Sequence, residues 1–146
     1  MNEREQYIDD ALKRIYADIM WIEEKELKKS SFKDLSIKEV HAIKAITMYS
    51  HQTASEVAKK LHLTPGTLTT TVDRLVRKNY VRRIPASDDR RVIRLGLTPK
   101  GRLVYRAHEA FHRKMVKSFL MDLDQGEVDT IYKAVRNLEA FLKAHS

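Results

Sequence analysis

The stretch TPGTLTTTVDRLVRKNYVRRIPASDDRRVIRLGLTPKG, residues 64–101, decides the fold. It opens with Thr64, a good helix N-cap, and Pro65, whose fixed φ suits the first helical position. Apolar residues then recur at helical spacing along one stripe, so residues 65–78 are predicted to form an amphipathic helix. The stripe consists of Leu68, Val72, Leu75 and Val76.

The opposite face of this helix is small and hydroxyl-bearing at its start and cationic at its end. Two extended runs follow at 80–84 and 92–97, and the segment PASDDRR separates them. A helix that fits a major groove, followed by a hairpin with arginines at its tip, is typical of a winged helix-turn-helix. The sequence therefore predicts binding to duplex DNA. The predicted contact residues are Thr64, Gly66, Thr67, Thr70, Arg74, Arg77, Asp89, Arg90 and Arg91.

These residues are expected to divide into two roles on the helix. Thr67 and Thr70 are expected to contact base edges, with the thymine methyl group as one partner. Arg74 and Arg77 are expected to hold phosphates, which position the helix without reading sequence. The free amides at the helix start, beside Gly66, favour an anion because the helix dipole is positive there.

The hairpin tip is expected to reach a minor groove. Arg90 and Arg91 carry its positive charge, and a narrow A·T tract concentrates negative potential that attracts arginine. The competing interpretation is a hairpin tip that is only solvated. A palindromic, A·T-rich operator is the expected target, since two copies of such a helix read half-sites about one helical turn apart.

The charge balance supports a polyanionic partner. The 146 residues suit one domain, with a net charge of +8 and a pI near 9.7. Residues 1–35 carry nine acidic and seven basic side chains, so the remainder holds +10. This segregation favours a nucleic-acid surface over uniform solubilisation. A non-specific nucleoid protein would also need only a basic surface.

The composition excludes several other classes. There is no cysteine, which rules out disulfides and thiolate metal sites within these residues. No apolar run approaches the ~20 residues of a membrane span, and the acidic start does not resemble a signal peptide. We expect a cytoplasmic protein without a membrane partner.

Capping chemistry locates most helices. Ser36 with Glu39 and Thr53 with Glu56 both match the capping box. Asn79 suits the left-handed stop that ends the helix beginning at residue 65. The expected helices are 4–29, 37–49, 54–61, 65–78, 99–121 and 125–144.

Both ends of the chain carry narrow apolar stripes with coiled-coil-like spacing. One interpretation is an intrachain core; the other, which we favour, is a homodimer interface. We expect one domain, 1–146, with dimerisation helices at 1–35 and 99–146 and a winged-helix lobe at 36–98. The stripe positions are Ile8, Leu12, Ile15, Ile19 and Ile22, then Val128, Ile131, Val135, Leu138 and Leu142.

The wing sequence carries a family resemblance. Asp89-Arg-Arg91, followed by Leu97-Thr-Pro-Lys-Gly101, matches the pattern D-x-R…L-T-x-x-G, and Val72-Asp-Arg-Leu75 matches a recognition helix. Through these motifs the chain resembles the MarR family of bacterial transcription regulators. The resemblance implies a mostly α fold with a small antiparallel β wing. It also implies that Arg91 is the wing arginine, oriented by Asp89.

Other segments resemble a branch of that family whose members repress fatty-acid synthesis. They are Phe32–His41, Asp89–Ile93, Gly101–Leu103, Arg106–His108 and Phe111–Met115. The likeness implies a homodimeric repressor of type II fatty-acid biosynthesis genes. It also implies that long-chain acyl-acyl carrier protein is the corepressor.

Bulky apolar residues are candidates for an effector pocket. Methionine and aromatic side chains adapt to acyl chains, although each alone is more often core. The candidates are Trp21, Phe32, Phe111, Met115 and Phe119. A basic run could dock the acidic carrier protein or simply steer DNA; it consists of Arg102, Arg106, Arg113, Lys114 and Lys117.

The histidines leave two alternatives open. His108-Glu109-Ala-Phe-His112 matches H-E-x-x-H, the zinc-peptidase spacing, but a winged helix offers no dedicated substrate cleft. We therefore expect no enzyme and no cofactor. Zinc-sensing members of the MarR family imply a second alternative, a zinc-responsive regulator. Its ligands would be Glu24, His41, His108 and His112.

Overall fold

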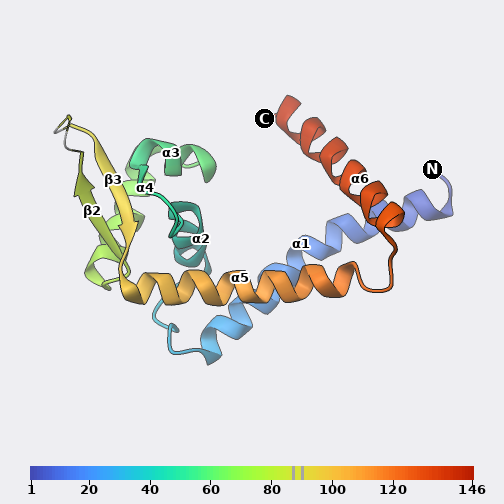
Figure 1. Ribbon diagram of the computed structural model, residues 1–146, viewed down its shortest axis with the longest axis horizontal. Helices are drawn as coiled ribbons and strands as arrows, with labels where there is room; N and C mark the ends of the chain where they lie inside the picture. Colours follow the sequence, from blue (N-terminus) through green and yellow to red (C-terminus); the bar gives the residue numbers. More distant parts are fainter. Residues whose placement is uncertain (87, 90) are drawn as a thin grey trace. The chain divides into compact units, whose positions relative to one another are not determined.

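A computed structural model describes residues 1–86, 88–89 and 91–146 (Figure 1). The helices among these residues are α1 (Glu3–Lys29), α2 (Ile37–Ile46), α3 (Ala54–Lys60), α4 (Pro65–Arg77), α5 (Pro99–Phe119) and α6 (Gln125–Ala144). The strands are β1 (Gln52–Thr53), β2 (Val81–Pro85) and β3 (Ile93–Leu97). The predicted class, mostly α with a small antiparallel wing, is confirmed.

The chain divides into two compact units, Met1–His108 and Glu109–Ser146. The first unit holds α1, the lobe of α2, α3 and α4, the sheet and the start of α5. The second holds the rest of α5 and all of α6. Within the described residues, no helix combines the length and apolar composition needed to cross a membrane.

The helix starts follow the predicted capping chemistry. Ser36 Oγ accepts from the Glu39 amide at 3.1 Å, and the Glu39 carboxylate accepts from the Ser36 amide at 2.9 Å. At Thr53 only the first half of the predicted box forms among the described residues, since Thr53 also belongs to β1. Asn79 adopts a φ of 67°, the left-handed stop expected after α4.

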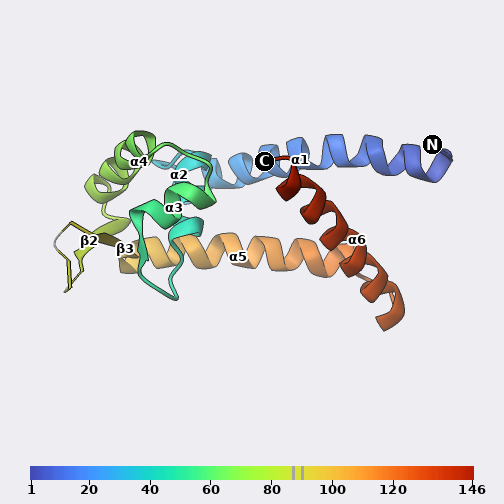
Figure 2. The same cartoon turned by 90° about the horizontal axis from the view of Figure 1, so that it is seen from above.

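The sheet has one strand more than the sequence predicted. Its order is β1-β3-β2, with both pairings antiparallel. β1 is only two residues long, too short to show the alternation that marks a strand. α2 also ends at Ile46 rather than at 49, because Thr47 takes a φ of 63°. Figure 1 shows β2 and β3 side by side, and Figure 2 shows the same hairpin nearly end-on, near α4 and the start of α5.

The core lies inside the first unit. Ile43 of α2, Leu75 of α4 and Tyr80 are fully buried in it. The start of α5 approaches this core closely, because a Cβ at Gly101 would lie 2.1 Å from the Tyr80 backbone oxygen. The glycine of the L-T-x-x-G pattern is thus required by contact between two backbones.

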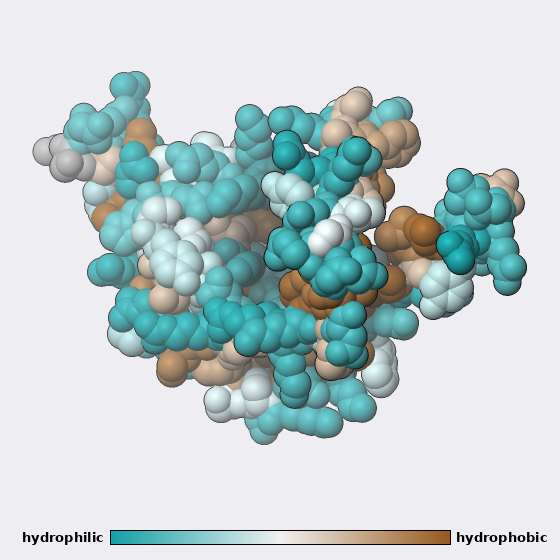
Figure 3. All heavy atoms as spheres, turned by 45° about the vertical axis from the view of Figure 1, so that its right-hand side comes forward, coloured by the Kyte–Doolittle hydropathy of each residue, from teal (hydrophilic) through white to brown (hydrophobic). Residues whose placement is uncertain are grey.

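The two terminal stripes are largely exposed. On α1, Ile8 is 56% exposed and Leu12 49%. On α6, Leu142 is 57% exposed and Val135 47%. Hydrophobic surface, brown in Figure 3, accordingly interrupts the hydrophilic exterior. Exposed apolar stripes of this kind mark interaction surfaces.

Candidate nucleic-acid interface

The exposed face of α4 presents a row of threonines whose hydroxyl hydrogens are already used. Thr70 Oγ1 donates to the Gly66 carbonyl at 3.1 Å. Thr69 and Thr71 donate to the carbonyls four residues before them, at 2.9 and 3.1 Å. Each of these oxygens can therefore only accept from an outside partner, and each side chain also offers a methyl group. Amino groups of adenine and cytosine, and the thymine methyl, match this chemistry.

Thr67 differs from these threonines because its hydroxyl accepts a hydrogen bond from another side chain, that of Thr64. Thr64 Oγ1 accepts from the Thr67 amide at 3.2 Å, which confirms Thr64 as the N-cap. The same Thr64 hydroxyl donates to Thr67 Oγ1 at 2.9 Å. Thr67 therefore keeps its own hydroxyl hydrogen for a partner, such as a phosphate or a purine acceptor. The face combines donor and acceptor chemistry within one helical turn.

Gly66 leaves open space at the start of α4. A Cβ at this position would meet no atom of the chain within 4 Å. Its φ is not in the left-handed region, so neither packing nor backbone conformation requires glycine here. The missing side chain instead allows another molecule to approach the helix backbone closely.

Arg74 and Arg77 lie on the outer side of the last turns of α4 and are exposed. Neither forms an ion pair within the described part of the chain, so both guanidinium groups remain available to phosphates. Asp73, the residue before Arg74 in α4, pairs with Arg83 of β2. This pair ties the first wing strand to the helix.

The wing tip is organised by Asp89. Its Oδ1 accepts from the Arg91 backbone amide at 2.9 Å and from the Arg91 Nε at 3.4 Å. The Arg91 side chain remains 93% exposed. The tip thus presents a partly oriented cation to solvent. Arg90, also predicted to bind DNA, lies outside the described residues.

Sequence reasoning missed an ionic network at the root of the wing. Lys78, the C-cap of α4, donates to the Asp34 carbonyl at 2.6 Å and to the Glu39 carboxylate at 3.0 and 3.2 Å. Burial alone would raise the pKa of Glu39. Its hydrogen bonds with the Ser36 amide and with Lys78 outweigh that effect and hold the pKa below its ordinary value.

Tyr80 completes this network. Its hydroxyl donates to Asp34 Oδ1 at 2.7 Å, and Lys100 of α5 lies over its ring at 4.3 Å from the centroid. Burial and then the bond to Asp34 raise the pKa of Tyr80 well above its ordinary value, so it stays neutral. Lys78 is 44 positions from Asp34 and 39 from Glu39 in sequence, and no spacing rule connects it to them. The end of α4, the wing root and the start of α5 are therefore held at one point.

Comparison with known proteins supports the same architecture. The crystal structure of Streptococcus pneumoniae FabT in complex with DNA superposes with a TM-score of 0.88 and 40% sequence identity, covering 97% of this chain and 99% of that one. The model described as MarR family matches residues 35–93. The chain belongs to the MarR family.

Two transcriptional regulators of Bacillus subtilis are less similar to this chain than FabT is. The HTH-type transcriptional regulator PchR of Bacillus subtilis (strain 168) is 25% identical over 108 residues, which are 72% of this chain. The chain spans 64% of the length of PchR. The uncharacterized HTH-type transcriptional regulator YpoP of the same organism is 29% identical over 124 residues, covering 85% of this chain and 80% of YpoP.

The predicted effector residues of this MarR-family chain lie in different environments. Phe32 packs against the core, with its ring centroid 6.3 Å from that of Tyr80, so core packing accounts for it. Trp21 is exposed on α1. In the second unit, Phe111 and Met115 are half-buried and Phe119 is exposed. The pocket that these five residues would form remains a prediction.

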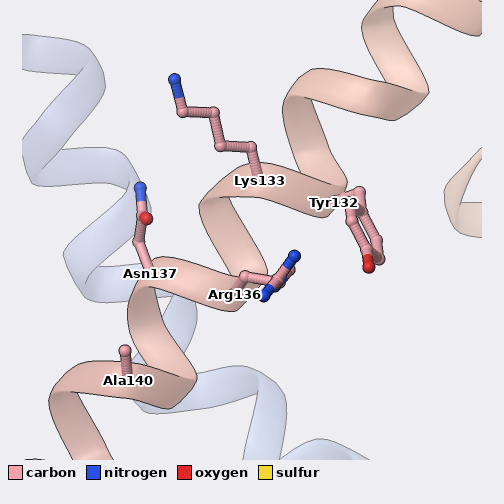
Figure 4. A pocket seen from close by; sticks show the side chains of 5 residues that line it. All are labelled: Tyr132, Lys133, Arg136, Asn137 and Ala140. Atoms are coloured by element: carbon pink, nitrogen blue, oxygen red, sulfur yellow. The ribbon is translucent and has the colours of Figure 1, made fainter.

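A separate hollow lies on α6 and includes none of those residues. Figure 4 shows its lining, which comes from successive turns of this single helix. The guanidinium carbon of Arg136 lies 5.7 Å from the ring centroid of Tyr132. The lining residues are Tyr132, Lys133, Arg136, Asn137 and Ala140.

The predicted metal ligands require one correction. Glu24 is exposed and pairs with Lys28 at 3.7 Å, whereas Glu23 is buried beside His41 and His108. Adjacent residues on a helix point about 100° apart, so Glu24 lies on a different face of α1 from the carboxylate that meets the two histidines. His112, the other predicted ligand, belongs to the second unit.

Proposed function

We propose that this MarR-family protein is a sequence-specific DNA-binding transcriptional repressor that acts as a homodimer. Its proposed targets are type II fatty-acid biosynthesis genes, and its proposed corepressor is long-chain acyl-acyl carrier protein. The observation that carries the DNA-binding part is the exposed face of α4. That face joins threonine donor and acceptor groups at its start to two arginines outside ion pairs in the described residues.

The proposed DNA contacts follow from this face. The start of α4 enters the major groove, where Thr67 donates and Thr70 accepts at base edges. Arg74 and Arg77 bind phosphates along the groove walls. Arg91 reaches the adjacent minor groove from the wing tip. The FabT structure, at 40% identity, is a complex with DNA, which supports this assignment.

The proposed homodimer rests on the exposed stripes of α1 and α6. Their apolar residues repeat at spacings of three and four, as helix-on-helix seams require. A dimer also gives the two recognition helices that a palindromic site needs. Burial of both stripes in a second copy would remove the apolar surface that one chain leaves in water.

The fatty-acid part rests on the similarity to FabT and on charge. Carrier proteins are acidic as a class, and α5 carries a run of basic residues. Acylated carrier protein would act as corepressor only to the extent that it binds the DNA-competent dimer more tightly than other forms. The basic residues are Arg102, Arg106, Arg113, Lys114 and Lys117.

The test measures fluorescence anisotropy of a labelled promoter fragment from a fatty-acid gene cluster, at fixed salt and with a chelator present. A random duplex of equal length and composition serves as the control. Each titration is repeated with apo carrier protein and with long-chain acyl carrier protein. We expect operator binding to exceed random binding by at least about 10³-fold and to tighten only with the acylated form.

Two other results would change the proposal in distinct ways. Equal affinity for both duplexes would refute sequence-specific repression and indicate a non-specific nucleoid protein. Specific binding that is indifferent to acylation would refute the corepressor while leaving the DNA-binding dimer intact.

A further inference from the structure

We propose that the solvent-facing side of the wing binds the phosphate backbone of DNA beyond the half-site that α4 reads. The residues that carry this second contact are Arg82 of β2, Arg94 of β3 and His51, which precedes β1. Their partner is duplex DNA of any sequence, held by charge and not by base reading. The inference rests on the proposed DNA binding through α4, and its surface includes none of the residues predicted to bind DNA.

The strand register divides the wing into two faces, because side chains alternate along each strand and paired residues share a side. One face points into the core, where Leu95 is 1% exposed, and towards α4, where Arg83 pairs with Asp73. The opposite side, here called the outer wing face, therefore points away from α4. The strand residues on the outer wing face are Arg82, Ile84, Arg94 and Gly96.

Gly96 brings the polar side chains of this face together. A Cβ on Gly96 would lie 3.2 Å from His51 Cδ2 and 3.4 Å from Arg82 Nε. Arg94 reaches the same place, because its Nη1 donates to the His51 carbonyl at 3.0 Å. A glycine within a strand leaves the space that such a close approach needs. The two arginines and the histidine thus gather over one small area of the sheet.

The positive charge of this area has no acidic partner in the part of the chain that the structure describes. Neither Arg82 nor Arg94 forms an ion pair there, whereas Arg83 on the other face is paired with Asp73. Arg94 uses one of its N–H groups on the His51 carbonyl and keeps the others, and the His51 ring keeps at least one N–H donor in either tautomer. Guanidinium groups of this kind match phosphate oxygens in charge and in geometry.

The position of this area within the wing favours DNA as the anion that it binds. Arg94 is three residues from Arg91, so their Cα atoms are at most about 10 Å apart. A duplex carries one negative charge per about 1.7 Å of its axis. A duplex that receives Arg91 in its minor groove therefore brings several phosphates close to the outer wing face. Because the sheet separates this face from α4, those phosphates belong to DNA beyond the half-site.

The test measures the anisotropy of two labelled duplexes with the full chain. The short duplex is the shortest one that keeps discrimination against random DNA of equal length. The long duplex adds about 10 bp of random sequence, one helical turn, at each end. The variants are Arg82→Gln, Arg94→Gln and the double variant. The controls are Arg82→Lys, which keeps the charge, and Lys28→Gln, which removes a charge from a side chain that is 75% exposed on α1. Thermal unfolding of each protein shows whether it has folded.

We expect the parent to bind the long duplex more tightly than the short one, with a steeper salt dependence. Each arginine contact that is lost should lower the salt slope on the long duplex by about one. Loss of both contacts in one protomer should reduce the fall in affinity between about 50 and 200 mM salt by about 10-fold. The two controls should behave as the parent does, and all the proteins should bind the short duplex equally.

Three outcomes would overturn the inference while leaving the operator binding intact. They are equal affinity of the parent for both duplexes, a double variant with the parent's affinity and salt slope on the long duplex, and equal losses on the short and long duplexes. Absence of discrimination between operator and random DNA would instead refute the proposed function, and this inference with it. If the double variant does not fold, Arg82→Gln alone decides by the same comparisons.

Discussion

Gly66→Ala should change folding stability and DNA affinity in opposite directions. A Cβ at this position meets nothing within 4 Å of the chain, so alanine fits α4 without displacement. Replacing a helical glycine whose φ suits alanine stabilises a protein by about 0.4–1 kcal/mol. In a protein of this size that corresponds to a rise in Tm of about 1–4 °C.

The same methyl group would occupy the space through which DNA approaches the helix backbone. Forcing an extra methyl group into a close-packed contact costs about 1–3 kcal/mol. At about 1.4 kcal/mol per tenfold, operator affinity should fall about 5- to 140-fold. Thermal unfolding and anisotropy with one operator duplex measure the two effects on the same preparation.

α6 provides a matched control. Gly126 is the second residue after the N-cap Asp124, as Gly66 is after the N-cap Thr64. Its carbonyl accepts from Thr130 Oγ1 as that of Gly66 accepts from Thr70 Oγ1. A Cβ at Gly126 would meet only the Asp124 carboxylate, at 3.4 Å. Gly126→Ala should therefore raise Tm similarly without weakening operator binding. If Gly66→Ala raises Tm and leaves operator affinity unchanged, the close approach of DNA at this position is refuted.

Three further predictions concern the wing and its root. Arg91→Ala should weaken binding to operator and random DNA alike. It should also make the salt dependence of DNA affinity shallower by about one phosphate contact. Salt titrations with an unchanged slope would exclude the wing from the DNA contact. Gly101→Ala should destabilise the chain by about 3 kcal/mol or more in urea unfolding, because its Cβ would lie 2.1 Å from a backbone oxygen; a cost below about 1 kcal/mol would contradict this packing. Glu39 has a lowered pKa, so its stabilising contribution is present above its unfolded pKa of about 4.3 and is lost as the pH falls through the folded value. Glu39→Gln should thus be less stable at pH 7 but lose less stability between about pH 5 and pH 3, and parallel acid-unfolding curves would argue against the network.

Local chemistry made much of the fold predictable. Three such signals depend only on residues close in sequence. They are Thr64 and Pro65 at the start of α4, Asn79 after the end of α4, and the capping box of Ser36 at the start of α2. Such signals act through backbone groups within a few positions, so one sequence contains them completely. The exposed threonine and arginine face of α4 followed from helical periodicity in the same way.

Features that depend on distant contacts were not predictable. β1 exists because Gln52 and Thr53 pair with β3, and two residues carry no strand pattern of their own. Glu23, rather than the predicted Glu24, is the buried carboxylate because the neighbours of α1 in space decide which side of the helix is covered. Lys78 was likewise not identified, since its partners Asp34 and Glu39 are about forty positions away.

The contact between Gly101 and Tyr80 joins the start of α5 to the residues that follow α4. The Thr98 hydroxyl donates to the Asn79 carbonyl at 2.7 Å beside that contact, so two interactions join the first turn of α5 to the end of α4. α4 has 13 residues and is therefore about 20 Å long. A rotation of α4 by about 10° about this contact would move its far end, where Thr67 lies, by about 3.4 Å. That distance is the rise of one base pair. A small change of angle at the start of α5 would thus move Thr67, which we propose contacts base edges, by a distance comparable to one base-pair step.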